Sequence, residues 1–132
     1  MQLKLVPNEP KYWEFLRVLR NDERVRGGFI KQEYITTEQH EEYMLSYGDI
    51  FHVCLVDNIP AGYIRVFGED IGVCTHPDFQ KKGIGKFMVN NVVAAHPDAV
   101  AKIKIENEAS IKLFESCGFV KKYYLLEKCG PV

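Results

Sequence analysis

The sequence predicts a mixed α/β (α+β) fold in which helices cover the faces of a central, partly antiparallel sheet. Three apolar, β-branched segments between residues 50 and 75 are separated by short turn sequences, which is typical of an antiparallel meander. Downstream, helix-like and strand-like patterns alternate twice, at 85–105 and 109–126, as they do in βα units. A mixed sheet accommodates both patterns.

The first part of the chain predicts one strand and two helices. Residues 2–6 alternate polar and apolar side chains, as a half-buried strand does. Pro10 can occupy the first turn of a helix, which apolar spacing extends to about Arg20. Thr36 supplies an N-cap hydroxyl for a second helix that runs to about Tyr47.

The rest of the chain predicts the meander and the two βα units. The meander strands are expected at 50–56, 63–67 and 71–75, with turns at 57–62 and 68–70. The later elements are expected as a helix at 85–95, a strand at 100–105, a helix at 109–117 and a strand at 119–126.

Length and charge exclude several classes of protein. With 132 residues the chain is expected to form a single domain spanning 1–132. Its 17 basic and 18 acidic residues argue against a general nucleic-acid binder. No apolar run approaches the roughly 20 residues of a membrane span, and the N-terminus lacks a signal-peptide pattern. We therefore expect a cytoplasmic protein that binds neither nucleic acid nor membrane. The four cysteines lack metal-ligand spacing, so no metal is expected.

A glycine-containing segment after the third meander strand carries the clearest chemical signal. Gly83 and Gly85 open a predicted helix, and Lys81, Lys82 and Lys86 lie beside them. The first turn of a helix has backbone N–H groups without internal partners, and glycines let a ligand approach them closely. The segment therefore predicts an anion site suited to a diphosphate. The alternative is an ordinary helix start with solvated lysines.

Two common nucleotide motifs do not fit this segment. A Walker A loop requires Ser or Thr after Gly-Lys, whereas Gly85-Lys86 is followed by Phe87. A dinucleotide fingerprint requires a third glycine, and Met88 stands in its place.

Two motifs resemble the GCN5-related N-acetyltransferase (GNAT) superfamily. Gln80-x-x-Gly83-x-Gly85 after a strand is similar to that family's acetyl-CoA loop, Gln/Arg-x-x-Gly-x-Gly/Ala. The segment from Asn107 to Phe119 is similar to its Asn-x-x-Ala/Ser-x-x-Leu-Tyr-x-x-x-Gly-Phe segment. The order of elements is also similar. The resemblance implies a GNAT-like fold with a twisted sheet of about six strands, splayed into a V between the fourth and fifth, and flanked by four helices.

The resemblance also implies acetyl-CoA as co-substrate, without a metal. The pantetheine arm would lie in the V beside the third meander strand, and the backbone amides of residues 81–86 would hold the pyrophosphate. The residues expected to contact the coenzyme are Val73, Cys74, Thr75, Gln80, Lys81, Lys82, Gly83, Ile84, Gly85, Lys86, Asn107 and Phe114.

The implied reaction is direct attack of a neutral amine on the thioester in a ternary complex. A backbone amide near Cys74 would stabilise the oxyanion. Phe114 stands where many relatives have a proton-donating tyrosine, which leaves Ser110 as a candidate donor, with water or a purely structural hydroxyl as alternatives. Glu69 is a candidate base, with a plain turn residue as the alternative, and Asn107 would help to shape the acetyl site.

Arg20-Asn-x-x-x-Val25-Arg26, followed by Ile35-Thr-x-Glu-x-His40, resembles the acceptor region of a GNAT branch that acts on nucleotide-linked amino sugars, polyamines and ribosomal-protein N-termini. Arg20, Arg24 and Arg26 could pair with substrate phosphates, although pairing with neighbouring acids is an equal alternative. His40 and His52 complete the expected acceptor residues, with structural roles as the alternative. We expect an amino sugar or a nucleotide-linked amino sugar as acceptor. A polyamine, a protein N-terminus or a catalytically degenerate coenzyme-binding module are the alternatives, and the protein is expected to be a monomer or a homodimer.

Overall fold

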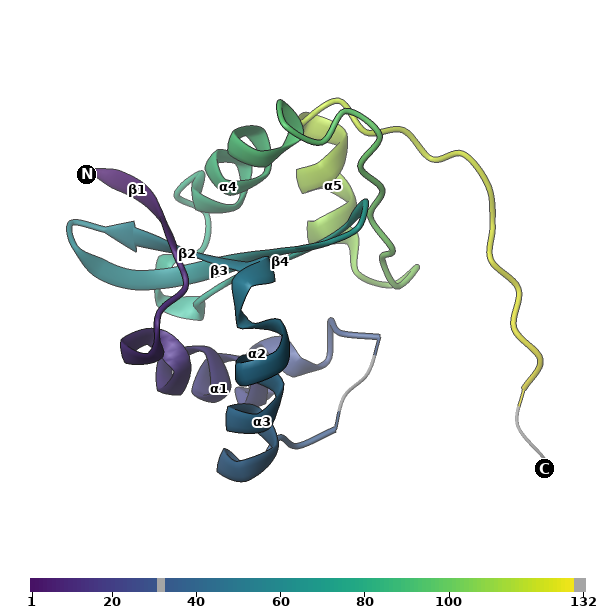
Figure 1. The fold of residues 1–132 in the computed structure, drawn as a ribbon. Helices are drawn as coiled ribbons and strands as arrows, with labels where there is room; N and C mark the ends of the chain where they lie inside the picture. Colours follow the sequence, from purple (N-terminus) through teal and green to yellow (C-terminus); the bar gives the residue numbers. More distant parts are fainter. Residues whose placement is uncertain (31–32, 130–132) are drawn as a thin grey trace.

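The computed structural model describes residues 1–30 and 33–129, and Figure 1 shows helices on both faces of a sheet. Within these residues the sheet contains four strands in the order β1-β2-β3-β4, with every neighbouring pair antiparallel. The strands are β1 (Leu3–Pro7), β2 (Phe51–Val56), β3 (Ile59–Phe67) and β4 (Asp70–Thr75). The predicted antiparallel meander is therefore confirmed.

The hairpin between β2 and β3 is tighter than the sequence suggested. Asp57 and Asn58 adopt positive φ values of 49° and 68°, which is the geometry of a two-residue hairpin turn that follows the twist of the strands. Pairing resumes at Ile59, four residues before the predicted start of the strand at 63. The register shifts between Cys54 and Leu55, opposite the stretch that contains Pro60.

In the described part of the chain, five α-helices lie around the sheet. They are α1 (Trp13–Asn21), α2 (Glu23–Arg26), α3 (Thr37–Tyr47), α4 (Ile84–Val93) and α5 (Glu108–Ser116), with short 3₁₀ turns at Pro10–Tyr12, Gly48–Ile50 and Pro77–Phe79. The start of α3 is fixed by the predicted capping box: the Thr36 hydroxyl accepts from the Gln39 amide, and the Gln39 side chain accepts from the Thr36 amide. The one-turn helix α2 was not predicted, because four residues show no apolar period.

Alternating side chains of the central strands divide the core into two layers. Phe51, Val53 and Cys74 pack with Leu16 and other residues of α1 and α3. Residues at the alternate positions of the central strands, such as Ile64 on β3, point to the opposite face of the sheet. They pack against α4 and α5. The last residues of β4 therefore lie between the two helical layers.

The prediction of about six strands is wrong for the described residues. Between β4 and residues 100–105 there is a single parallel bridge, from Asp70 to Val100. The Ile71 amide donates to the Val100 carbonyl at 2.9 Å, and the Val100 amide donates to Glu69 at 2.8 Å. The two segments pair at their first residues and then separate, so the splay is present but its second arm, residues 101–107, is not a regular strand.

The predicted strand at 119–126 is also absent from the described residues. This segment extends away from the body (Figure 1), and Tyr124 and Leu126 are 85% and 88% exposed. Its composition favours extended backbone, but a strand requires a partner for its N–H and C=O groups, and no other described segment pairs with this one.

No helix in the described part of the chain combines the length and apolarity needed to cross a lipid bilayer.

Candidate active site

The open end of the V begins where β4 leaves its partner. Beyond Ile71, no backbone hydrogen bond joins β4 to residues 101–107 among the described residues. The edge of β4 from Gly72 to Thr75 therefore presents its backbone groups to the V, as an unpaired strand edge does. An extended amide-containing ligand can bind such an edge through main-chain hydrogen bonds.

The predicted anion site lies directly after this edge. Gly83 is the N-cap of α4, has a φ of 78°, and makes no side-chain capping bond. The first-turn amides of α4 are therefore left without a side-chain partner, which suits them to a phosphate. A Cβ on Gly83 would meet no atom within 4 Å, so the left-handed backbone rather than crowding favours glycine here.

Gly85 has a different role, because its lack of a side chain lets neighbouring elements pack close to the start of α4. A Cβ at this position would lie 2.9 Å from Leu113 Cδ2 on α5 and 3.7 Å from the Thr75 hydroxyl at the end of β4. The start of α4, the end of β4 and the middle of α5 thus converge on one small volume. The structure brings the predicted coenzyme loop and the expected pantetheine strand together.

Asn107 stands at the far end of the second arm of the V. Its side chain accepts a hydrogen bond from the Ser110 amide at 3.2 Å and thereby caps α5. Its amide nitrogen lies 2.9 Å from the position that a Cβ on Gly28 would take. Ser110 is half-buried in the first turn of α5. Asn107 and Ser110 lie near the open end of the V. Their catalytic roles stay predictions.

Phe114 and Ile84 lie deeper than expected for coenzyme contacts. Phe114 is 4% exposed, and its ring is 5.0 Å from that of Phe119 in an edge-on contact. Ile84 is 1% exposed in the same cluster. Their side chains fill the core under α4 and α5, so Ile84 can offer a ligand only its backbone, and Phe114 acts as packing.

The cysteine on β4 is buried. Burial raises the pKa of Cys74 to about 12, because the apolar surroundings disfavour the thiolate. A thiol that stays protonated at neutral pH cannot readily accept an acetyl group. This environment favours direct transfer over an acyl-enzyme on Cys74.

The candidate base Glu69 is not well placed to act on an amine near Thr75. His76, which directly follows Thr75, accepts a hydrogen bond from the Asp78 amide through Nδ1 at 3.1 Å. Glu69 is exposed and precedes Thr75 by six residues, roughly 20 Å of extended strand. The structure does not bring Glu69 to the open end of the V.

Two of the three arginines are engaged within the protein. The Arg20 guanidinium lies 5.4 Å from the Tyr43 ring centre and 5.9 Å from that of Phe51. Arg24 binds Asp22 with both ends of its guanidinium, at 3.0 and 2.7 Å, which confirms the alternative of pairing with a neighbouring acid. Arg26 is half-buried in the last turn of α2.

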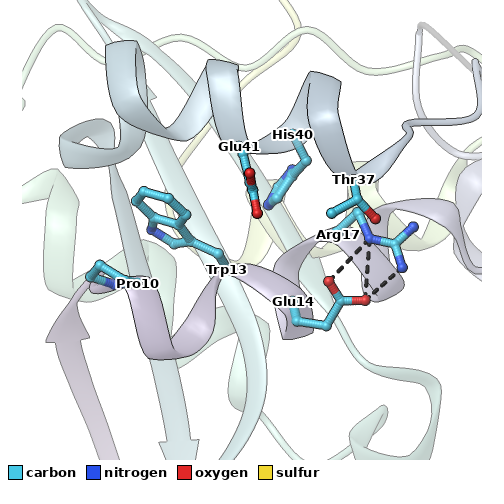
Figure 2. Close-up of a pocket in the computed structure, with 7 residues that line it drawn as sticks. All are labelled: Pro10, Trp13, Glu14, Arg17, Thr37, His40 and Glu41. Atoms are coloured by element: carbon cyan, nitrogen blue, oxygen red, sulfur yellow. Dashed lines mark hydrogen bonds and ion pairs between the residues drawn. The ribbon is translucent and has the colours of Figure 1, made fainter.

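The two histidines do not lie together at the V. His40 is 2% exposed and lines a hollow of about 150 Å³ between α1 and α3, shown in Figure 2. Burial lowers the pKa of His40, so the ring is neutral near pH 7. His52 alternates with Phe51 and Val53 and therefore points to the opposite face of the sheet.

The contacts across the open end of the V were not predicted from the sequence. The Lys104 ammonium donates to the Gly27 carbonyl at 2.9 Å, and Arg24 lies 3.7 Å from Asp78. Both contacts join residues more than 50 positions apart. The only local signal was Asp22, an acceptable N-cap residue, whose side chain accepts from the Arg24 amide.

Within the described residues, no group of three or more His, Cys, Asp or Glu side chains is arranged to hold a metal ion.

Comparison with known proteins agrees with this geometry. The family model of the acetyltransferase (GNAT) domain matches residues 47–121. No curated protein matches the sequence. Three solved structures share the fold at low identity. Spermidine N-acetyltransferase from Vibrio cholerae, in complex with CoA and spermine, has a TM-score of 0.83 at 19% sequence identity. The matched region covers 96% of this chain and 86% of the Vibrio cholerae chain.

The other two structures come from different organisms. A domain from Methanocaldococcus jannaschii has a TM-score of 0.81 at 24% identity, covering 92% of this chain and 90% of its own. The yncA protein of Salmonella typhimurium, with its cofactor acetyl-CoA, has a TM-score of 0.75 at 18% sequence identity. The matched region covers 89% of this chain and 79% of the yncA chain. Since the family model covers more than half of the sequence, including β4, the glycine loop and α5, this chain belongs to the GNAT acetyltransferase family.

Proposed function

We propose that the protein transfers an acetyl group from acetyl-CoA to the primary amine of a small acceptor. One observation carries the proposal: the unpaired edge of β4 is followed, after a short 3₁₀ turn, by a helix N-terminus that Gly83 leaves uncapped. A strand edge and a phosphate site in succession match an elongated ligand that has amides at one end and a diphosphate at the other.

The reaction follows from the direction in which β4 runs. With the diphosphate on the first turn of α4, the pantetheine arm extends back along β4 and places the thioester beside residues 73–75. A backbone amide there stabilises the oxyanion as the amine attacks. The new C–N bond forms, the C–S bond breaks, and the proton that the amine nitrogen loses balances the one that the departing CoA thiolate takes up. No covalent enzyme intermediate is needed, in agreement with the protonated thiol of Cys74.

A small cationic amine fits the acceptor side better than the nucleotide-linked amino sugar that the sequence favoured. Of the three arginines expected to pair with acceptor phosphates, Arg20 lies over two aromatic rings and Arg24 is bound to Asp22. The similar Vibrio cholerae structure, which contains CoA and spermine, supports a polyamine as the first acceptor to test.

The test combines calorimetry with a thiol-release assay. We expect acetyl-CoA to bind and CoA thiol to be released faster in the presence of a polyamine than with a nucleotide-linked amino sugar or an N-terminal peptide. Release with the amino sugar alone would restore the original acceptor. Binding without turnover on any amine would indicate a degenerate coenzyme-binding module, and absence of binding would overturn the proposal.

A further inference from the structure

Residues 120–126, here called the arm, form an apolar segment that no other described part of the chain covers. The arm extends away from the body in Figure 1. Its last four side chains are large and apolar, and they are between 75% and 88% exposed: Tyr123, Tyr124, Leu125 and Leu126. A contiguous exposed apolar segment marks an interaction site, whereas scattered exposed residues do not. The exposure of the arm therefore indicates that it binds a partner surface.

The hollow between α1 and α3 has the size of one aromatic ring. Its volume is about 150 Å³, and a cavity of about this volume can hold a benzene molecule. Figure 2 shows Pro10 and Trp13 at one end of the hollow and the ion pair of Glu14 with Arg17 at the other. The hollow therefore offers an apolar end for a ring and a polar end for a hydrogen-bonding group.

His40 is the buried group in this hollow that the fold leaves unsatisfied. Its ring lines the hollow from α3, as Figure 2 shows, and the residue is 2% exposed. Neither ring nitrogen has a hydrogen-bond partner among the described residues, although the Trp13 backbone lies close to the ring. A neutral imidazole has one acceptor nitrogen, which can take a hydrogen bond from a hydroxyl group. Because an unpaired buried acceptor costs free energy, the hollow favours an occupant that brings a hydroxyl donor.

Opposite charges on the two surfaces favour the arm of a second copy as that occupant. Helix α3 contains three glutamates and no lysine or arginine, and one of the three, Glu41, lines the hollow. In the arm, Lys121 and Lys122 directly precede the two tyrosines. Complementary charge steers two surfaces together and fixes their register. The arm leaves α5 on the face of the sheet opposite to the hollow (Figure 1), which favours the hollow of a second copy over its own.

We propose that one tyrosine of the arm, Tyr123 or Tyr124, fills the hollow of a second copy of this chain and donates its phenol hydrogen to His40. Successive side chains of an extended segment point in opposite directions, so only one of the two tyrosines enters the hollow. Mutual exchange of arms between two copies gives a closed twofold dimer. The inference goes beyond the proposed function and does not depend on it, because neither the arm nor the hollow includes a residue of the coenzyme loop or of β4.

Sedimentation velocity of the full chain measures the association that exchange of arms produces. The wild-type protein should form a dimer at micromolar concentration. Tyr123→Phe and Tyr124→Phe each keep the ring and remove the hydroxyl, and both lie on an exposed segment outside the folded body. One variant should raise the dissociation constant of the dimer about fivefold, as loss of a typical hydrogen bond does, and the other should match the wild-type protein.

Two further comparisons locate the hydrogen bond and the charge. In His40→Ala, the sensitive tyrosine substitution should have no additional effect, because the acceptor is already gone. Glu41→Gln should weaken the dimer more than Glu42→Gln, since Glu41 lines the hollow and Glu42 does not. If His40→Ala folds poorly, the tyrosine and glutamate variants still decide the question.

Three results would overturn the inference. The first is a monomeric wild-type protein, and the second is an equal effect of the two tyrosine substitutions. The third is a dimer that Glu41→Gln weakens no more than Glu42→Gln does, which would indicate that the arms bind elsewhere, for example along residues 101–107.

Discussion

Replacing Gly83 with alanine tests the coenzyme site most directly. Gly83 has a φ of 78°, and a Cβ there would meet no atom within 4 Å, so the substitution adds backbone strain without a clash. An L-residue in the left-handed region costs roughly 1–2 kcal/mol. For a domain of this size, each kcal/mol lowers Tm by about 4 °C. Any relaxation of φ toward the right-handed region also turns the first amides of α4 away from the phosphate.

Two other glycines are matched controls, because a Cβ on either would also meet nothing within 4 Å. Gly68 has a φ of 61° in the turn before β4, whereas Gly27 has a φ of −61° at the end of α2. We expect Gly68→Ala to lose as much stability as Gly83→Ala but to keep its affinity for acetyl-CoA. We expect Gly27→Ala to lose neither.

The assay pairs thermal denaturation with titration calorimetry. Gly83→Ala should lower Tm by several degrees and weaken acetyl-CoA binding at least tenfold, since the main-chain donors to a diphosphate move together. A variant with wild-type affinity would refute the assignment of the phosphate to this helix terminus. A Tm as high as that of Gly27→Ala would refute the reasoning about strain.

Three further outcomes follow from burial and close contact. Gly62→Ala places a Cβ 2.6 Å from the Cys74 carbonyl oxygen, so it should cost about 1–3 kcal/mol in urea denaturation, and an unchanged midpoint would show that the strands can separate. Iodoacetamide at pH 8 should label exposed Cys129 and spare Cys54 and Cys74, because burial raises the pKa values of these two thiols to about 11 and about 12. Peptide mapping that finds labelled Cys74 in the folded protein would contradict this expectation. Phe114→Tyr buries a hydroxyl and should lower stability by about 1–3 kcal/mol without faster thiol release, whereas increased turnover would return that position to the reaction.

The sequence predicted those features that depend on neighbouring residues. The capping box at Thr36, the helical period of α1 and the glycines that open α4 each act over a few positions, and all three form as expected. The start of β3 was misplaced because Ile59 and Pro60 read as turn residues, while in the structure their cross-strand partners Val56 and Leu55 hold them in the sheet.

Features that depend on a distant partner could not be predicted. Residues 100–105 and 119–126 have the composition of strands, but composition favours an extended backbone without specifying what lies beside it. Likewise, nothing near Arg24 in the sequence indicates Asp78, 54 positions away, or shows that its guanidinium is already paired. The same limit applies to His40, whose position on a helix did not reveal that it faces α1 rather than the V.

The location of the site follows from how β4 is used on each of its sides. Cys74 fills the layer under α1, and Thr75 approaches the start of α4, so both faces of the strand end are covered by protein. One edge is paired with β3. The remaining edge loses its partner after Ile71, and the unpaired backbone groups there carry a free-energy cost unless water or a ligand satisfies them. A full fifth strand would remove that cost and with it the binding edge. The interrupted pairing, which the family resemblance implied as a V, is therefore the feature on which the proposed coenzyme binding depends.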